Sequence, residues 1–278
     1  MNRPLVSICI PTYRGAAFLP ATIESVLRQS YSNFEIWIID DASPDDTANV
    51  VDAFKDERIH YLRNERNLGP NANWNRCLDL ARGKYYKLLP QDDLLEQDSL
   101  AEHVAILEAD TAEEIALVFG SRLIIDDRGR AFFNRGLGGK RAARIDGQAL
   151  IRRCVRAGTN LIGEPGNGLI RRSVAELVGP YDANHPYLVD LDYWFRVLTH
   201  GDAYYTSKRS SCFRVSPGSW SVALGSKQYR DFKGFVEKFA ADPCFGISRA
   251  DKLVGFAKAR VNMLGRALIY RSLFKGQA

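Results

Sequence analysis

Short apolar runs alternate with amphipathic segments in the first third of the chain. We expect each run to be a strand, because runs of this length are typical of buried strands in a parallel sheet. They are residues 5–10 (stopped by Pro11), 36–39, 59–62 and 85–89. The segments with helical spacing are residues 18–29, 46–56 and 72–81. This alternation, with short connections, predicts a wound α/β sheet built from right-handed crossovers.

Beyond residue 93 the pattern changes and helices dominate. We expect helices at residues 99–108, 147–156, 173–178 and 190–199, with extended segments at 116–120, 122–126 and 168–170. Asp127-Arg128-Gly129 has the composition of a hairpin turn, and the loop 134–144 is rich in glycine and arginine. Residues 249–275 read as one long helix.

Two pairs of acids follow two of the predicted strands. Asp40-Asp41 ends the second run, and Asp92-Asp93 comes shortly after the fourth. Carboxyl ends of parallel strands meet at one edge of a sheet, where open α/β sheets bind ligands. Four carboxylates there would repel one another unless a cation or a hydrogen-bonding ligand lay among them. This pattern favours a nucleotide-sugar site with Mg²⁺ or Mn²⁺; the alternative is that the acids form turns and helix caps.

Asp190 is a candidate general base. It opens a predicted helix, where the helix dipole favours acids whatever their function. The apolar residues 187–189 precede it, and partial desolvation would raise its pKa and make it a better base. Arg214, in the polar segment 213–221, could clamp a phosphate while Trp220 packs on a sugar; the alternative is an ordinary surface loop.

Composition excludes several classes of protein. Hydrophobic content of 46% and charged content of 26% are those of a globular protein long enough to bury a large core. The five cysteines lack CxxC spacing and the four histidines lack ligand spacing, which argues for a reducing compartment and against disulfides or zinc. We expect neither a membrane span nor a signal peptide, because no apolar run is long enough and the N-terminus leads directly into a strand.

The net charge of +5 leaves the partner open. Basic residues crowd one part of the helix 249–275, which could lie on an anionic membrane surface or dock on the domain with its basic side in water. Nucleic-acid binding is not expected, because the basic residues are dispersed and lack an aromatic stacking motif.

An ordered set of segments carries a resemblance to a known family. The segments are residues 6–13, 25–31, 39–43, 67–69, 73–75, 81–85 and 91–93. Together they resemble the family-2 inverting glycosyltransferases with the GT-A fold, closely over residues 4 to about 100 and loosely over about 160–221. The resemblance implies a Rossmann-like wound mixed sheet flanked by helices. We expect a GT-A domain at 1–221, with a nucleotide-binding half (about 1–100) and an acceptor half (about 101–221), and a helical C-terminal extension at 222–278.

The resemblance also implies roles for individual residues. Asp41 would meet the nucleobase, and Asp190 would deprotonate the acceptor hydroxyl. Asp92 and Asp93 stand in the place of the family's metal-binding DxD motif, so that Asp92 would also lie near the donor; Arg214 is expected there as the phosphate clamp inferred above from its own segment. The remaining residues expected at the nucleotide are Pro11, Thr12, Tyr13 and Asn67.

The implied reaction moves a sugar from a nucleotide-diphosphate donor to a saccharide or lipid-linked saccharide, with a divalent cation as cofactor. Surface polysaccharide synthesis in the cytoplasm, with the basic helix at the inner membrane face, is the implied setting.

The chain departs from the family pattern at four positions. Pro90 replaces the first DxD acid, and Val189 the glutamate before the base. Ser216 stands where many members have a histidine, and Arg14 where an asparagine is common. These departures keep open a catalytically impaired nucleotide-sugar-binding relative. A nucleotidyltransferase is a further alternative, although residues 11–15 lack the lysine-containing, glycine-rich loop expected of that class.

Overall fold

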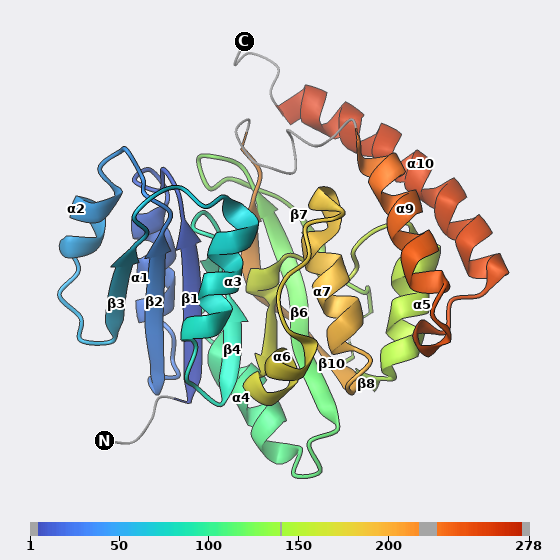
Figure 1. The fold of residues 1–278 in the computed structure, drawn as a ribbon, viewed down its shortest axis with the longest axis horizontal. Helices are drawn as coiled ribbons and strands as arrows, with labels where there is room; N and C mark the ends of the chain where they lie inside the picture. Colours follow the sequence, from blue (N-terminus) through green and yellow to red (C-terminus); the bar gives the residue numbers. More distant parts are fainter. Residues whose placement is uncertain (1–4, 140, 217–226, 274–278) are drawn as a thin grey trace.

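The computed structural model describes residues 5–139, 141–216 and 227–273, with the backbone alone for 267–273 (Figure 1). A mixed sheet crosses the molecule in the order β3-β2-β1-β4-β9-β6-β10-β5, and β7 and β8 extend it beside β6 and β10. The strands are β1 (Val6–Thr12), β2 (Phe34–Asp40), β3 (Ile59–Arg63), β4 (Tyr85–Leu88), β5 (Leu94–Leu95), β6 (Ile115–Ile125), β7 (Ala131–Arg135), β8 (Ala143–Ile145), β9 (Gly168–Arg171) and β10 (Asp202–Arg214).

Helices cover both faces of this sheet. They are α1 (Leu19–Leu27), α2 (Thr47–Asp52), α3 (Pro70–Leu80), α4 (Ser99–Ala109), α5 (Gly147–Ala157), α6 (Arg172–Val178), α7 (Val189–Val197), α9 (Gln228–Ala240) and α10 (Arg249–Leu273). Short 3-10 turns are η1 (Pro165–Asn167), η2 (Pro186–Leu188) and η4 (Pro243–Phe245). In Figure 1, α9 and α10 lie at the opposite side of the molecule from α2 and β3.

Two hydrophobic clusters form the core, one on each face of the sheet. Strand alternation divides the side chains: Ile8 and Ile10 enter the cluster that α1 and α4 cover, whereas Cys9 enters the other cluster. Helices α3, α5, α6 and α7 pack on the second face, and α9 joins them through Phe235 and Phe239. Both faces of the sheet are therefore buried, which explains the continuous apolar runs in the sequence.

The predicted α/β pattern is present, with shifts of a few residues at most element ends. β1 does not stop at Pro11 but continues to Thr12. Pairing of β1 with β4 ends at Cys9, so Pro11 has a strand partner on one side only, and its missing N–H costs no ladder bond on the other side.

The two extended segments predicted at 116–120 and 122–126 form a single strand, β6. Gly120 lies in its middle, where a Cβ atom would come within 1.8 Å of Ser210 Oγ on β10. Gly120 therefore permits close approach of the neighbouring strand.

The sequence pattern did not reveal β10, a 13-residue strand. Its pairing with β6 shifts register between Tyr205 and Ser211, and Ser207 has a left-handed φ of 61°. These irregularities interrupt the period-two alternation by which a strand is recognised. The pattern also missed β5, β7, β8 and α9.

The C-terminal helices share the core of the sheet-containing region. Phe232 and Ala259 belong to the cluster on the second face. The predicted boundary at residue 221 falls outside the described residues, so the division into domain and extension stays a prediction. Among the described helices, none combines the length and hydropathy needed to cross a bilayer. All five cysteines are free thiols.

Candidate active site

A cavity of about 500 Å³ lies at the carboxyl edge of the sheet. Pairing directions make β1, β2, β4, β6 and β10 run the same way, so their carboxyl ends all meet there. Most of the residues predicted for the site line this cavity: Pro11, Thr12, Tyr13, Asp41, Asn67, Asp92, Asp190 and Arg214. Asp93 is not among its lining residues.

Asp40 and Asp41, the first acid pair, have different roles. Asp40 is fully buried and accepts hydrogen bonds from Ser43 N (2.9 Å) and Tyr61 Oη (2.6 Å), while its Oδ2 pairs with Arg63 (3.2 Å). It fixes the turn after β2 and has no place in the cavity wall. Asp41 is the member that reaches the cavity.

Asp41 organises the loop before α3. Its Oδ1 accepts from Asn64 Nδ2 (2.7 Å) and Leu68 N (2.8 Å), and its Oδ2 accepts from Gly69 N (2.8 Å). Asn67 in turn donates to the Asp41 carbonyl (3.2 Å). Since each carboxylate oxygen has two lone pairs, Oδ2 keeps capacity for one further donor at the cavity wall.

Gln91 joins the ends of β1 and β4. Its Oε1 accepts from Tyr13 N (2.9 Å) and its Nε2 donates to the Tyr13 carbonyl (3.0 Å). Thr12 accepts the Asp41 amide through its carbonyl (2.7 Å). The three loops that line this side of the cavity are therefore tied to one another, by the Gln91 side chain and by a backbone hydrogen bond. Arg14, with a left-handed φ of 54°, donates its amide to Ser43 Oγ (2.9 Å) in the same region.

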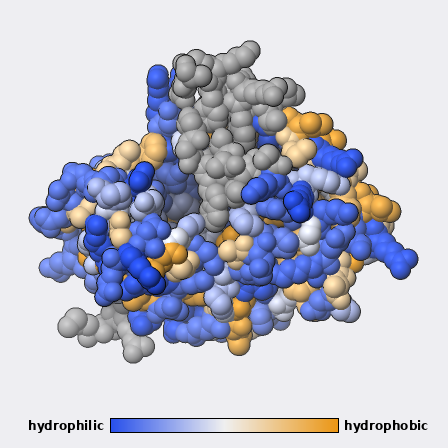
Figure 2. Space-filling view, turned by 45° about the horizontal axis from the view of Figure 1, so that its top comes forward, coloured by the Kyte–Doolittle hydropathy of each residue, from blue (hydrophilic) through white to orange (hydrophobic). Residues whose placement is uncertain are grey.

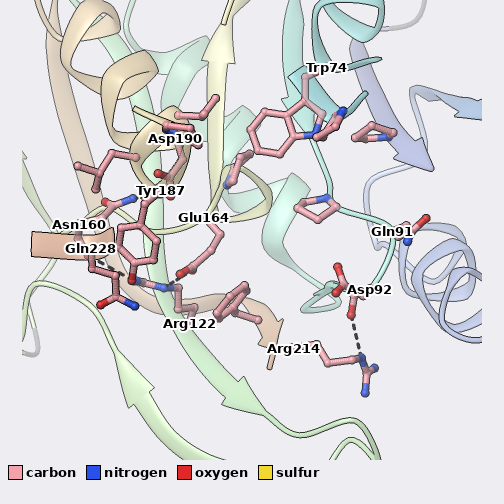
Figure 3. A pocket seen from close by; sticks show the side chains of 18 of the residues that line it. Trp74, Gln91, Asp92, Arg122, Asn160, Glu164, Tyr187, Asp190, Arg214 and Gln228 are labelled. Atoms are coloured by element: carbon pink, nitrogen blue, oxygen red, sulfur yellow. Dashed lines mark hydrogen bonds and ion pairs between the residues drawn. The ribbon is translucent and has the colours of Figure 1, made fainter. Parts of the chain in front are cut away.

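Asp92 and Asp93, the second acid pair, also differ: one lines the cavity and the other is buried behind it. Asp93 is buried, and its Oδ1 accepts the Arg214 amide (3.0 Å) at the end of β10. Burial, with the neighbouring charge of Asp92, raises the pKa of Asp93 well above its usual range. Asp92 lies on the cavity wall, and burial raises its pKa as well. In Figure 3 it sits beside Gln91, and the dashed line joins it to Arg214.

Arg214 is held by backbone oxygens. Its Nε donates to the Asp92 carbonyl (2.9 Å), and its Nη1 donates to the carbonyls of Asp126 (2.9 Å) and Asp127 (3.1 Å). Its guanidinium also lies over the Phe18 ring, 4.8 Å from the centroid. These contacts leave Nη2 without a hydrogen-bond acceptor among the described residues, so it remains able to bind an anion.

The donor set at Asp92 fits a hard cation that is held mainly by its substrate. Magnesium and manganese prefer oxygen ligands, and Mg²⁺ is commonly bound by one or two carboxylates plus substrate phosphates and water. Asp92 offers one carboxylate, which has no side-chain donor among the described residues. In that part of the chain, no group of three or more His, Cys, Asp or Glu side chains is placed to hold a metal alone.

Asp190 lies on the other side of the cavity, at the start of α7 (Figure 3). Its Oδ2 accepts from Asn160 Nδ2 (2.8 Å) and its Oδ1 accepts from its neighbour's amide, Leu191 N (2.7 Å). Burial, and next the negative charge of Glu164, raise the pKa of Asp190 to about 7. A carboxyl group with this pKa is suited to take up a proton near neutral pH.

Glu164 and Arg122 are site residues that the sequence pattern did not reveal. Arg122 Nε lies 2.5 Å from Glu164 Oε2, and the arginine side chain is only 1% exposed. Both residues line the cavity near Asp190, and Arg122 Nη2 also donates to the Asn160 carbonyl (3.4 Å). The sequence offered little indication of either residue, because each is a single charged residue outside any recognisable motif.

Two further features were missed. Trp74 projects into the cavity between Asp190 and Gln91 (Figure 3) and offers an aromatic face. Behind the wall, Lys87 is buried on β4 and donates to the carbonyls of Gly166 and Gly168 (both 2.8 Å). Burial lowers the pKa of Lys87 to about 7. Lys87 thereby fixes η1, the turn that follows Glu164.

The positions that depart from the family pattern are distributed as follows. Pro90 and Val189 both line the cavity. Ser216 is described but is not a lining residue. Ser219, Trp220 and Ser221, which belong to the predicted polar loop, lie outside the described residues.

Two curated relatives show similarity over most of the chain. An uncharacterized protein of Mycobacterium tuberculosis is 31% identical over 202 residues, which are 70% of this chain and 62% of that protein. WfaP of Escherichia coli, a UDP-Glc:alpha-D-GlcNAc-diphosphoundecaprenol beta-1,3-glucosyltransferase, is 29% identical over 219 residues, 78% of this chain and 80% of that protein. The chain thus spans less than two thirds of the mycobacterial relative.

Solved structures share the fold. A fragment of S. aureus TarS, residues 1–349 in a complex with UDP-GlcNAc, superposes with a TM-score of 0.69 at 16% identity; the match covers 89% of this chain and 69% of that fragment. The mannosyltransferase PcManGT of Pyrobaculum calidifontis, in a complex with GDP-Man and Mn²⁺, gives 0.60 at 18% identity, over 98% of this chain and 76% of its own. The predicted GT-A fold, a central mixed sheet flanked by helices, is confirmed.

The family model "Glycosyl transferase family 2" matches residues 7–179. This segment includes the β1, β2 and β4 ends, both acid pairs, and the Glu164 turn. Since the match spans more than half of the sequence, the chain belongs to glycosyl transferase family 2.

Proposed function

We propose that this protein transfers a sugar from a nucleotide-diphosphate donor to a hydroxyl acceptor, with inversion at the anomeric carbon. The observation that carries the proposal is the shared cavity. Asp92 and Arg214 line one side of it, and Asp190 lies on the opposite side (Figure 3). Inversion needs a base and a leaving group on opposite faces of the sugar, which this arrangement allows.

The nucleotide would lie at the side formed by β1, β2 and β4. Asp41 would accept a hydrogen bond from the base through the free capacity of Oδ2, with Pro11, Thr12, Tyr13 and Asn67 around it. Arg214 Nη2 would pair with the diphosphate. Trp74 would pack on an apolar face of the base or the sugar.

Asp190 would act as the general base. As the acceptor oxygen forms its bond to the anomeric carbon, Asp190 takes the hydroxyl proton, and the bond to the diphosphate oxygen breaks. The electron pair of that bond leaves with the nucleoside diphosphate. Asn160 holds the Asp190 carboxylate through its amide, so that the base keeps one orientation.

A divalent cation, Mg²⁺ or Mn²⁺, would be held by Asp92, with Asp93 behind it fixing the end of β10. When bound, such a cation stabilises the negative charge that develops on the diphosphate. The presence of Mn²⁺ in the PcManGT complex supports a divalent cation as cofactor, by analogy of fold.

The names of two relatives support a proposal for the acceptor and the setting. WfaP is named for a lipid-linked acceptor, and a B. subtilis relative, 35% identical over 107 residues, carries the name of a putative teichuronic acid biosynthesis glycosyltransferase. We therefore propose that the reaction belongs to surface polysaccharide synthesis and takes place at the cytoplasmic face of a membrane.

The first experiment is a thermal-shift titration with UDP, GDP, dTDP and CMP, each with Mn²⁺, Mg²⁺ or EDTA. A ligand at 100 times its dissociation constant should add about 2.7 kcal/mol to the free energy of unfolding. Stabilisation by one nucleoside diphosphate, with metal only, supports the donor site and selects the sugar nucleotides for a transfer assay. Binding without transfer to any acceptor would favour the catalytically impaired relative, and no stabilisation at all would contradict the proposal.

A further inference from the structure

Three arginines lie on the side of the cavity that holds Asp190, which we call the acceptor side. Arg122 comes from β6, Arg135 from the end of β7 and Arg266 from α10, and all three line the same cavity. Their charges are close enough to act on one another: burial, then the charge of Arg122, and more weakly that of Arg266, lower the pKa of Arg135, whereas the negative charge of Glu164 opposes this shift without cancelling it. The cluster therefore brings positive charge from three distant parts of the chain to one wall.

Two of these arginines lack a carboxylate partner. Arg122 pairs with Glu164. Arg135 donates to Thr159 Oγ1 (3.1 Å) and Arg266 donates to Tyr187 Oη (3.0 Å), both neutral oxygens. Among the described residues neither guanidinium lies within 4 Å of an acid, and the segments outside them contain no aspartate or glutamate.

Arg266 carries a further sign of a missing ligand. Its Nε is buried and has no hydrogen-bond acceptor among the described residues. Leaving a buried charged donor unsatisfied costs free energy, and bringing like charges together adds to that cost. An anion bound between Arg135 and Arg266 would remove both penalties.

We propose that Arg135 and Arg266 form an anion subsite that binds the phosphate or diphosphate of a lipid-linked acceptor. The subsite lies on the side of the cavity that holds Asp190, apart from Asp92 and Arg214, so it is separate from the position assigned to the donor diphosphate. Phe232 and Ala259 line the cavity beside it and provide an apolar wall for the first part of a lipid chain. This proposal rests on the proposed function, of which it names the acceptor class.

The test is calorimetric titration of the full chain with inorganic pyrophosphate in EDTA, without donor or turnover. Loss of a charge-assisted hydrogen bond to phosphate should weaken binding by about tenfold or more. We expect R135Q and R266Q each to lose this much affinity, and R135K and R266K to retain most of it. The matched control is R260Q, which removes the same charge from an exposed position on α10 outside the cavity.

Several results would overturn the subsite. They are no measurable binding of pyrophosphate to the wild type, binding by R135Q and R266Q that is as tight as that of the wild type, or an equal loss in R260Q, which would indicate general surface electrostatics. Displacement of pyrophosphate by saturating UDP with Mg²⁺ would place the anion at the donor side and also overturn it. Melting curves of each variant separate these results from unfolding.

A second arm identifies the source of the phosphate. Decyl diphosphate should bind the wild type more tightly than pyrophosphate does, because its chain contacts the apolar wall. Equal affinities would contradict the lipid-linked acceptor. Neither arm needs sugar transfer, so the two proposals can fail separately. If R266Q loses pyrophosphate affinity while the wild type does not bind UDP, the subsite is retained and the proposed function is rejected.

Discussion

The two sides of the cavity are held in different ways. On the donor side, charged groups are fixed by backbone atoms: Asp41 accepts the amides of Leu68 and Gly69, and Arg214 donates to three carbonyls. On the acceptor side, side chains fix one another, as in the Asn160–Asp190 bond and the Arg122–Glu164 ion pair. The difference suggests that substitutions on the donor side will disturb folding and binding together, whereas those on the acceptor side will change reactivity with less effect on the fold.

The largest expected effect is that of D190N. Removing the general base should lower the transfer rate by about 10²- to 10⁴-fold, while the affinity for the nucleoside diphosphate stays unchanged. Initial rates of product formation and a nucleotide titration measure the two. Full transfer activity in D190N would disprove the assignment of the base; slow donor hydrolysis would not rescue it, because water can react without that base.

D190N should also change how stability depends on pH. The pKa of Asp190 in the folded protein is about 7, above its ordinary value of 3.8. Between these values the folded state binds a proton that the unfolded state has lost, so this group lowers the free energy of unfolding as pH rises from about 4 to 7. D190N removes this pH-dependent loss of unfolding free energy. The variant should therefore be more stable than the wild type above pH 7, and the difference in stability between the two should vanish near pH 4. Denaturant melts across this range test the sign.

The next largest effect is expected on the donor side. D41A leaves the amides of Leu68 and Gly69 without their acceptor, which should cost about 1–3 kcal/mol of unfolding free energy and weaken nucleotide binding in parallel. The matched control is D46N, at an exposed aspartate on the same loop. A stable D41A protein with intact nucleotide affinity would contradict the view that the two roles are joined.

Two substitutions on the acceptor side should shift the pKa of Asp190 by smaller amounts and in opposite directions. N160A removes a hydrogen bond that favours the charged carboxylate of Asp190, so the apparent pKa of the acid limb of kcat/KM should rise. E164Q removes a neighbouring negative charge, so the same limb should move to lower pH. Both shifts are expected to be about one pH unit or less. Shifts in the same direction would show that another group controls the limb.

The smallest effect concerns the outer face of α10. Leu253, Val261 and Leu264 are exposed there, and Lys258 and Arg260 stand exposed beside them. Figure 2 shows hydrophobic surface at the side of the molecule where α10 lies. If this face lies on anionic lipid, L253E/L264E should weaken sedimentation with phosphatidylglycerol vesicles several-fold relative to L177E, an equally exposed leucine on α6. Equal sedimentation of both variants would contradict membrane docking by α10.

The donor side was largely readable from the sequence. Strand ends, their acids and the turns after them are adjacent in the chain, so the local pattern alone places Thr12, Asp41 and Asp92 on one edge of the sheet. The pattern did not distinguish the members within each pair: Asp40 and Asp93 looked equivalent to their neighbours but face inward to hold Tyr61 and Arg214. Which of two adjacent carboxylates turns to the cavity depends on strand twist and on partners that are distant in sequence.

The sequence by itself determined the wound α/β order, the two acid-bearing strand ends and the candidate base, because local periodicity and short motifs specify these features. Only the tertiary structure joined Arg122, Arg135 and Arg266, and brought Glu164 and Asn160 to Asp190. Those residues lie on separate elements whose meeting depends on how β6, α7 and α10 pack. Their charge, burial and pKa arise from that packing, which no local pattern encodes.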